Sequence, residues 1–141
     1  MGYTHYFKEL KRELHEEELN IINKIIKESG VLIRGGSGDS DSTPSVLKYM
    51  IRLNGDEVDD QGHETFQIGA GDTKFNFCKT ARKPYDVVVV AICIYLKSLG
   101  IFSWSSDGGP EDHKEGQELL LKCCPDADVK KGAARTDDDE D

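Results

Sequence analysis

The stretch FNFCKTARKPYDVVVVAICIYLKSLG, residues 75–100, decides the fold of this chain. Phe75 and Phe77 alternate with polar or small residues, which predicts a strand with one apolar face. The residues after Pro84 are almost all apolar, and the run is too long for an ordinary strand, so we expect a helix that reaches Leu99. A helix that is apolar on all sides belongs inside a domain. It is too short, and too polar at its ends, to span a bilayer, so we expect no membrane partner.

Both ends of this predicted helix carry end signals. Pro84 suits the first helical position, because its missing N–H costs nothing there. Asp86 in the first turn and Lys97 in the last turn complement the helix dipole. Gly100 is placed to end the helix.

The composition bounds the class of protein. With 141 residues the chain is long enough for one domain with its own core. Its net charge of -9 argues against nucleic acid as a partner, because such proteins need a basic face. The end of the chain is acidic and lacks large apolar residues. We therefore expect a domain over residues 1–124 and a disordered acidic tail over residues 125–141.

The cysteines and the start of the chain indicate the compartment. Four cysteines are present and none form a C-x-x-C pair: Cys78, Cys93, Cys123 and Cys124. The first residues lack an apolar signal segment, so we expect a reducing, cytoplasmic environment with free thiols. The glycine-rich loop at residues 35–45 completes neither a phosphate loop nor a calcium loop, and we expect no cofactor.

The remaining segments predict the architecture. A long amphipathic helix is expected over Lys8 to Ser29, and a short last helix after Pro110. Strands are expected at residues 3–7, 31–33, 47–53, 63–68, 75–77 and 101–105. This order predicts a single-domain α+β fold with a mainly antiparallel sheet and helices on one face of it. The long N-terminal helix, the buried central helix and the short C-terminal helix would supply those helices.

A polar run precedes the central helix and is the main candidate site. Its members carry cations or a hydroxyl donor: Lys79, Thr80, Arg82 and Lys83. A helix N-terminus attracts anions, and an arginine fork matches phosphate or carboxylate. We therefore expect an anionic, phosphate-bearing small molecule to bind at the N-terminus of the Pro84 helix, with catalysis on it as a less favoured extension. The alternative is that these cations pair with the protein's own acids, such as Asp86 or those of Asp56 to Asp60.

Two weaker hypotheses concern His63 and Cys78. Cys78 lies just before a cationic run and a helix N-terminus, both of which lower a thiol pKa. His5 or His63 would then act as the base for a Cys78 nucleophile. A zinc site from the same three residues is chemically feasible, but no ligand spacing supports it. The favoured alternative is that Cys78 is a small buried residue.

Four short segments together resemble a known group of sequences: MGYTHYF at 1–7, HETF at 63–66, FCKTARKPYD at 77–86 and SDG at 106–108. They are similar to a family of small hypothetical proteins from phage, bacterial and some fungal genomes. The resemblance implies a shared fold and an occurrence in mobile elements, and it supplies no ligand or catalytic residue. The alternative function is therefore a protein–protein interaction module, such as an inhibitor or accessory factor of a mobile element.

Overall fold

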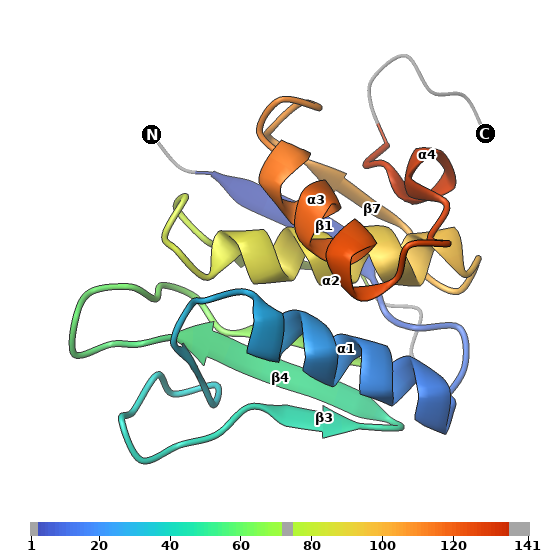
Figure 1. Ribbon diagram of the computed structural model, residues 1–141. Helices are drawn as coiled ribbons and strands as arrows, with labels where there is room; N and C mark the ends of the chain where they lie inside the picture. The colour runs from blue at the N-terminus through green and yellow to red at the C-terminus, as the bar shows by residue number, and fades with distance from the viewer. Residues whose placement is uncertain (1–2, 72–74, 136–141) are drawn as a thin grey trace.

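The computed structural model describes residues 3–71 and 75–135 of the chain. Its strands are β1 (Thr4–Lys8), β2 (Ile33–Arg34), β3 (Ser45–Leu47), β4 (Met50–Gly55), β5 (Phe66–Gly69), β6 (Phe75–Lys79) and β7 (Trp104–Ser106). Its helices are α1 (Glu16–Glu28), α2 (Asp86–Ser98), α3 (Lys114–Cys123) and α4 (Val129–Gly132). The predicted single-domain α+β fold is confirmed (Figure 1).

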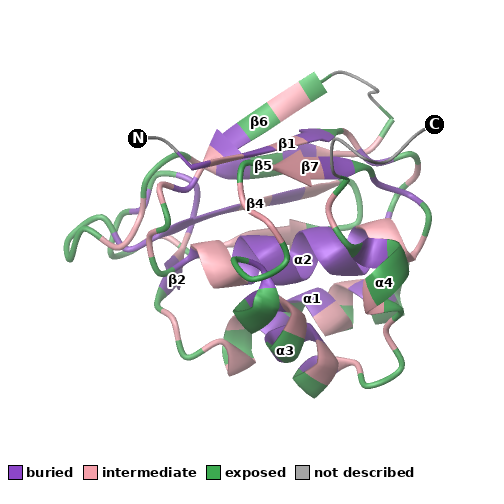
Figure 2. Ribbon diagram, turned by 90° about the horizontal axis from the view of Figure 1, so that it is seen from above, coloured by how far each residue is buried: buried purple, intermediate pink, exposed green. Residues whose placement is uncertain are grey.

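The strands form two small antiparallel sheets that meet at one end. One sheet has the order β6-β1-β7, and the other has the order β2-β4-β3 with β5 paired to β4. The Leu10 N–H donates to the Gly69 carbonyl at 2.9 Å, which joins the chain after β1 to the end of β5. Figure 2 shows the helices on one side of the strands and β6 on the opposite side. The helices therefore cover one face, as predicted.

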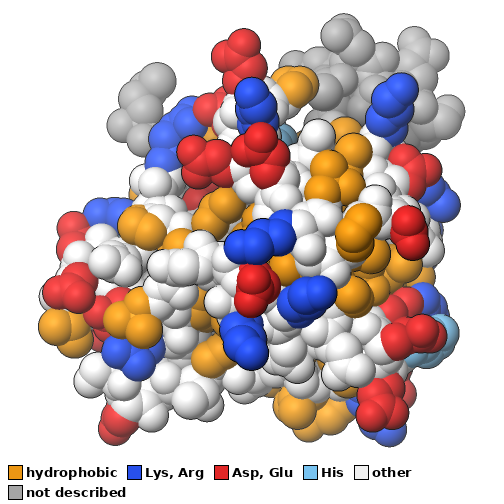
Figure 3. All heavy atoms as spheres, viewed as in Figure 1, with side chains coloured by type: hydrophobic (Ala, Val, Ile, Leu, Met, Phe, Trp, Pro, Cys, Tyr) orange, Lys and Arg blue, Asp and Glu red, His pale blue; other side chains and the backbone are white. Residues whose placement is uncertain are grey.

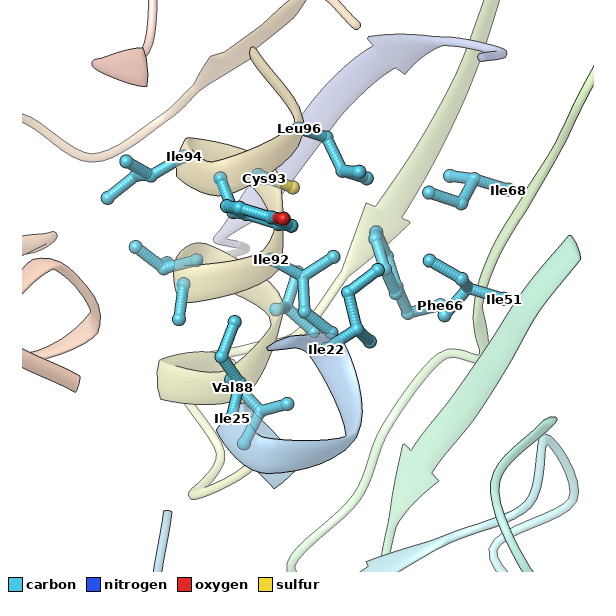
Figure 4. Packing of buried hydrophobic residues seen from close by; sticks show 14 of the residues in the cluster. Ile22, Ile25, Ile51, Phe66, Ile68, Val88, Ile92, Cys93, Ile94 and Leu96 are labelled. Carbon is cyan, nitrogen blue, oxygen red and sulfur yellow. The ribbon is translucent and has the colours of Figure 1, made fainter. Parts of the chain in front are cut away.

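The central helix α2 organises the core. Every residue from Val88 to Leu96 is buried, as expected for a helix that is apolar on all sides. In Figure 4, Ile22 and Ile25 of α1 lie beside α2, and Phe66 lies beyond them toward β4. No helix in residues 3–71 and 75–135 is both long and apolar enough to cross a membrane.

The observed ends of α2 lie close to the predicted ends, whereas α1 begins much later than predicted. α2 begins at Asp86, after a turn that contains Pro84, and Gly100 with φ +78° follows its end as predicted. The helix predicted from Lys8 begins only at Glu16, because Lys8 belongs to β1. The intervening segment is fixed by backbone hydrogen bonds to other strands and loops, including Leu14 N–H to the Lys48 carbonyl at 2.7 Å.

The strand predicted over residues 47–53 is a hairpin. Leu47 pairs with Met50, so Lys48 and Tyr49 form a two-residue turn between β3 and β4. Ile51 and Leu53 are buried, as predicted, whereas Leu47 and Tyr49 are exposed. Alternation of apolar residues predicted the buried part correctly and gave no sign of the turn.

The predicted apolar face of β6 points the other way. Phe75 and Phe77 are 65% and 54% exposed, whereas Cys78 is fully buried. The pairing of His5 with Cys78 across β1 and β6 places those two side chains toward the helices. The two phenylalanines therefore stand on the outer side of the sheet, contrary to the prediction.

The chain is ordered beyond the predicted boundary at residue 125. The Trp104 indole Nε1 donates to the Gly132 carbonyl at 2.9 Å, and the Arg135 N–H donates to the Trp104 carbonyl at 2.9 Å. A Cβ at Gly132 would lie 2.2 Å from the Ile94 carbonyl oxygen, so this backbone packs directly on α2. Small residues achieve this packing without large apolar side chains, which explains why composition predicted disorder. The rest of the predicted tail, residues 136–141, lies outside the described residues.

Candidate binding site at the mouth of the central helix

The connection between β6 and α2 is a tight turn with an unusual backbone. The Lys83 N–H donates to the Thr80 carbonyl at 3.0 Å, and the two residues between them have positive φ: 53° at Ala81 and 59° at Arg82. Positive φ at a non-glycine residue costs about 1–2 kcal/mol. The Ala81 N–H donates to the Tyr3 carbonyl at 3.2 Å and helps to hold the turn. Such strain is characteristic of functional sites, and it fixes the direction in which Arg82 leaves the backbone.

Arg82 is held at the surface by two contacts. Its Nη1 donates to Asp112 Oδ1 at 2.6 Å, and its Cζ lies 4.1 Å from the centre of the Tyr3 ring. The hydrogen bond from Arg82 lowers the pKa of Asp112. The Arg82 side chain nevertheless remains 60% exposed. The guanidinium is therefore oriented in advance and still open to solvent.

The other predicted cations are less strongly placed. Lys83 Nζ lies 2.9 Å from Asp60 Oδ2, and the Asp60 side chain is 87% exposed. Lys79 is half-buried, and its backbone N–H donates to Glu64 Oε1 at 2.7 Å. Two of the predicted cations, Arg82 and Lys83, thus do pair with acids of the protein. The partner of Arg82 is Asp112 rather than the Asp86 considered from the sequence.

Thr80 faces inward and is already engaged. Its Oγ1 donates to Asp86 Oδ1 at 2.6 Å, and His5 Nε2 lies 2.6 Å from the same oxygen. Thr80 and His5 are both fully buried. The Asp86 carboxylate thus occupies the first turn of α2, where a negative charge is favoured. The prediction that Thr80 donates to a ligand is wrong, because its hydroxyl serves Asp86.

Aromatic and histidine rings close around His5. Ring centres of Tyr3, Trp104 and His113 lie 5.2, 5.4 and 5.9 Å from that of His5. His113 Nε2 lies 3.1 Å from Ser106 Oγ. Burial lowers the pKa of His113 to about 4. His5 Nδ1 is buried without a hydrogen-bond partner among the described residues.

Cys78 does not have the surroundings of a nucleophile. It is fully buried, and burial raises the pKa of its thiol to about 12. Its Sγ lies 3.5 Å from the Glu64 carbonyl oxygen. Desolvation therefore outweighs the nearby cations and helix N-terminus, and the nucleophile hypothesis is wrong. The packing alternative describes Cys78 correctly.

The predicted zinc set is not assembled either. His63 is exposed, and its backbone N–H and carbonyl bond to the Asn54 side chain at 3.1 and 3.0 Å. His5 is committed to Asp86. Within residues 3–71 and 75–135, no three His, Cys, Asp or Glu side chains are grouped so that they could hold a metal ion.

A groove of about 610 Å³ opens beside the strained turn. Arg82 and Lys83 line it beside the turn, and Val87 and Val90 of α2 contribute an apolar wall. The other wall comes from the start of α3 and the residues before it, with the end of α1 nearby. Its members are Glu111, Asp112, Glu115, Gly116 and Leu119. Figure 3 shows acidic and basic side chains mixed over the N-terminal end of α3.

Three of the four segments that carry the resemblance lie next to one another around the turn before α2. Tyr3 and His5 come from the first segment, Arg82 and Asp86 from the longest one, and Ser106 from the Ser-Asp-Gly segment. Sequence reasoning missed the residues that α3 and its approach contribute. These are Asp112 and His113, which no motif or spacing marks.

Comparisons of the chain with protein-family models, with curated proteins and with solved structures gave no match. The chemistry of this place must therefore be argued from its geometry. Its elements are a preset, exposed guanidinium, a second cation, an apolar wall and four carboxylates, one of which, Asp112, bonds Arg82.

Proposed function

We propose that the groove beside α2 binds a small molecule through an anionic group, with Arg82 as the principal anchor and Lys83 beside it. The observation that carries this proposal is the state of Arg82. Its guanidinium is oriented by a strained turn, by the Tyr3 ring and by Asp112, yet the side chain stays 60% exposed and lines a groove. A donor that is already oriented loses less conformational entropy on binding than a flexible one.

The ion pairs that Arg82 and Lys83 make at present do not prevent this. An exposed ion pair contributes only about 0–1 kcal/mol. The carboxylate partners are Asp112, with its side chain 33% exposed, and Asp60, which is 87% exposed. A phosphate or carboxylate that receives two parallel hydrogen bonds from the guanidinium can replace the single bond from Arg82 Nη1 to Asp112.

The rest of the groove constrains the remainder of the ligand. Half-buried Val87 offers apolar contact beside the cations, whereas Val90 and Leu119 are only 1% and 8% exposed. Glu111 and Glu115 line the groove and favour hydroxyl or amino donors on the ligand. Asp86 also lines it, but its Oδ1 already accepts from Thr80 and contacts His5. A ligand with one phosphate or carboxylate and a polar body fits this arrangement better than a polyanion.

Calorimetry tests the proposal with inorganic phosphate, sugar phosphates and nucleoside monophosphates as probes. A hydrogen bond to a charged group contributes about 1.5–3 kcal/mol, so Arg82→Ala should weaken binding about tenfold or more. Arg82→Lys should also weaken it, because an ammonium cannot reproduce the planar fork. Lys48→Ala, an exposed cation in the β3–β4 turn, is the matched control and should leave binding unchanged.

Failure of every probe to bind the wild-type protein would remove the proposal. Equal affinity of the Arg82→Ala variant would do the same. In either case the protein–protein interaction module predicted as the alternative becomes the leading hypothesis.

A further inference from the structure

The outer face of the β6-β1-β7 sheet, on the side away from the helices, carries a second feature that the groove does not use. Pairing of Tyr6 with Phe77 and of Lys8 with Phe75 makes these four side chains neighbours on one face. Phe75 and Phe77 are 65% and 54% exposed. The intervening residues of β1 are buried, which confirms that this set points outward. Figure 2 shows β6 on the side of the strands away from the helices.

Two of the aromatic rings on this face are stacked nearly parallel to each other. The rings of Tyr6 and Phe75 are within 18° of parallel, with centres 6.1 Å apart. A shallow pocket of about 190 Å³ lies next to them, lined by Tyr6, Lys8, Phe75, Ser105 and Arg135 among others. Exposed aromatic rings gathered on one face mark a binding surface rather than a packing defect.

The charge of this face is opposite to that of the protein. The whole chain has 27 acidic and 18 basic residues. The outward positions of β1 and β6 nevertheless carry cations and no carboxylate: Thr4, Tyr6, Lys8, Phe75, Phe77 and Lys79. Three acids lie near its edges and are engaged: Glu64 accepts from the Lys79 N–H, Asp107 from the Thr4 N–H, and Glu9 from Asn76 and the Gly69 N–H. The face is thus a cationic, aromatic patch on an acidic protein.

We propose that the outer face binds single-stranded nucleic acid. Bases stack on Tyr6, Phe75 and Phe77, and the backbone phosphates contact Lys8 and Lys79. Stacking of unpaired bases on exposed rings of a sheet, with flanking cations, is a recurrent mode of single-strand binding. The expectation of no nucleic-acid partner rested on net charge, and net charge does not describe this face.

Other occupants fit the face less well. A second copy of the chain packed on this face would bring two lysines from each copy, Lys8 and Lys79, into one interface, and the repulsion of like charges opposes association. A duplex offers no unstacked bases, and this flat face has no helix or ribbon to enter a groove.

Fluorescence anisotropy with labelled single-stranded DNA and RNA of about 12 nucleotides tests the proposal at low salt, because single-strand sites span about 4–16 nucleotides. The Phe75→Leu, Phe77→Leu double variant keeps the apolar surface and loses the rings. It should bind about tenfold more weakly or worse, since stacking dominates this mode. Tyr49→Leu, which removes a 53% exposed ring elsewhere, should bind like the wild type.

Two further variants separate this site from the groove. Lys8→Ala should reduce the magnitude of the slope of log affinity against log salt concentration by about 0.7, which is the value for one phosphate contact on a single strand. Arg82→Ala should leave oligonucleotide binding unchanged, because Arg82 lies at the groove and not on this face.

Three results would overturn the proposal: no binding of single strands to the wild type at low salt, equal binding of duplex, or unchanged binding of the double leucine variant. Sedimentation of the wild type and the double variant would then show whether the rings join two copies of the chain instead. Circular dichroism melts of each variant confirm that it is folded.

Discussion

At the scale of single residues, Asp86 is the group on which the neighbourhood of the strained turn depends. Its Oδ1 accepts from Thr80 and contacts His5, both fully buried. Asp86→Ala would leave two buried polar groups without a partner, at about 1–3 kcal/mol each. The free energy of unfolding, measured with urea, should therefore be lower in this variant by at least about 1–3 kcal/mol. Asp59→Ala, an exposed acid, is the control, and an equal loss in both variants would contradict the role given to Asp86.

His113 makes the stability of the protein depend on pH. Burial lowers its pKa from 6.5 to about 4 in the folded state, so the unfolded chain takes up the proton first. The stability contributed by neutral His113 is complete above pH 6.5 and is lost as pH falls toward 4. The free energy of unfolding, measured over this range, should fall, and His113→Asn should show a shallower slope. Parallel slopes for the two proteins would show that other groups cause the effect.

At the scale of elements, the contact between α2 and α3 depends on Gly116. A Cβ there would lie 2.4 Å from Val90 Cγ1. Gly116→Ala should therefore destabilise the protein by about 1–3 kcal/mol, the usual cost of overpacking. Gly109→Ala meets nothing within 4 Å and is the matched control for chemical denaturation. A variant at Gly116 as stable as the control would mean that the helices can move apart at no cost.

Prediction from sequence succeeded where one physical signal dominated. The apolar run from Val88 to Leu96 could belong only inside the domain, and α2 lies there. The sequence also indicated that Arg82 and Lys83 lie at the turn before α2, because the cations and the helix start are contiguous in sequence; that this turn is a binding site remains a proposal. The hydrogen-bond partners around this turn were not predictable from the sequence. The roles of Thr80 and Asp112 depend on partners brought together by folding, and the exposure of Phe75 depends on strand register.

At the scale of the whole molecule, the chain after Pro125 contributes to the domain. The hydrogen bond from Trp104 to Gly132 and the contact of Gly132 with Ile94 tie it to β7 and α2. Deletion of residues 126–141 should therefore lower the melting temperature and change the fluorescence of the single tryptophan. Deletion of residues 136–141 alone is the control. An unchanged melting temperature in the longer deletion would contradict this contribution.

The acidity of the protein is also distributed unevenly. Acids line the groove, whereas the outer face of the β6-β1-β7 sheet carries Lys8 and Lys79. The two proposed sites lie on different sides of the strands (Figure 2) and call for different variants. The resemblance to small proteins of phage and bacterial genomes remains a prediction, and it is compatible with either function.

The most direct test of the proposed groove site is a nuclear magnetic resonance titration of the ¹⁵N-labelled protein with a sugar phosphate. The account predicts shifts of backbone resonances at Arg82, Lys83 and Val87, saturable with ligand and absent in the Arg82→Ala variant. The resonances of Phe75 and Phe77 should stay in place. Shifts confined to the outer face, or no saturable shift at the turn before α2, would contradict it.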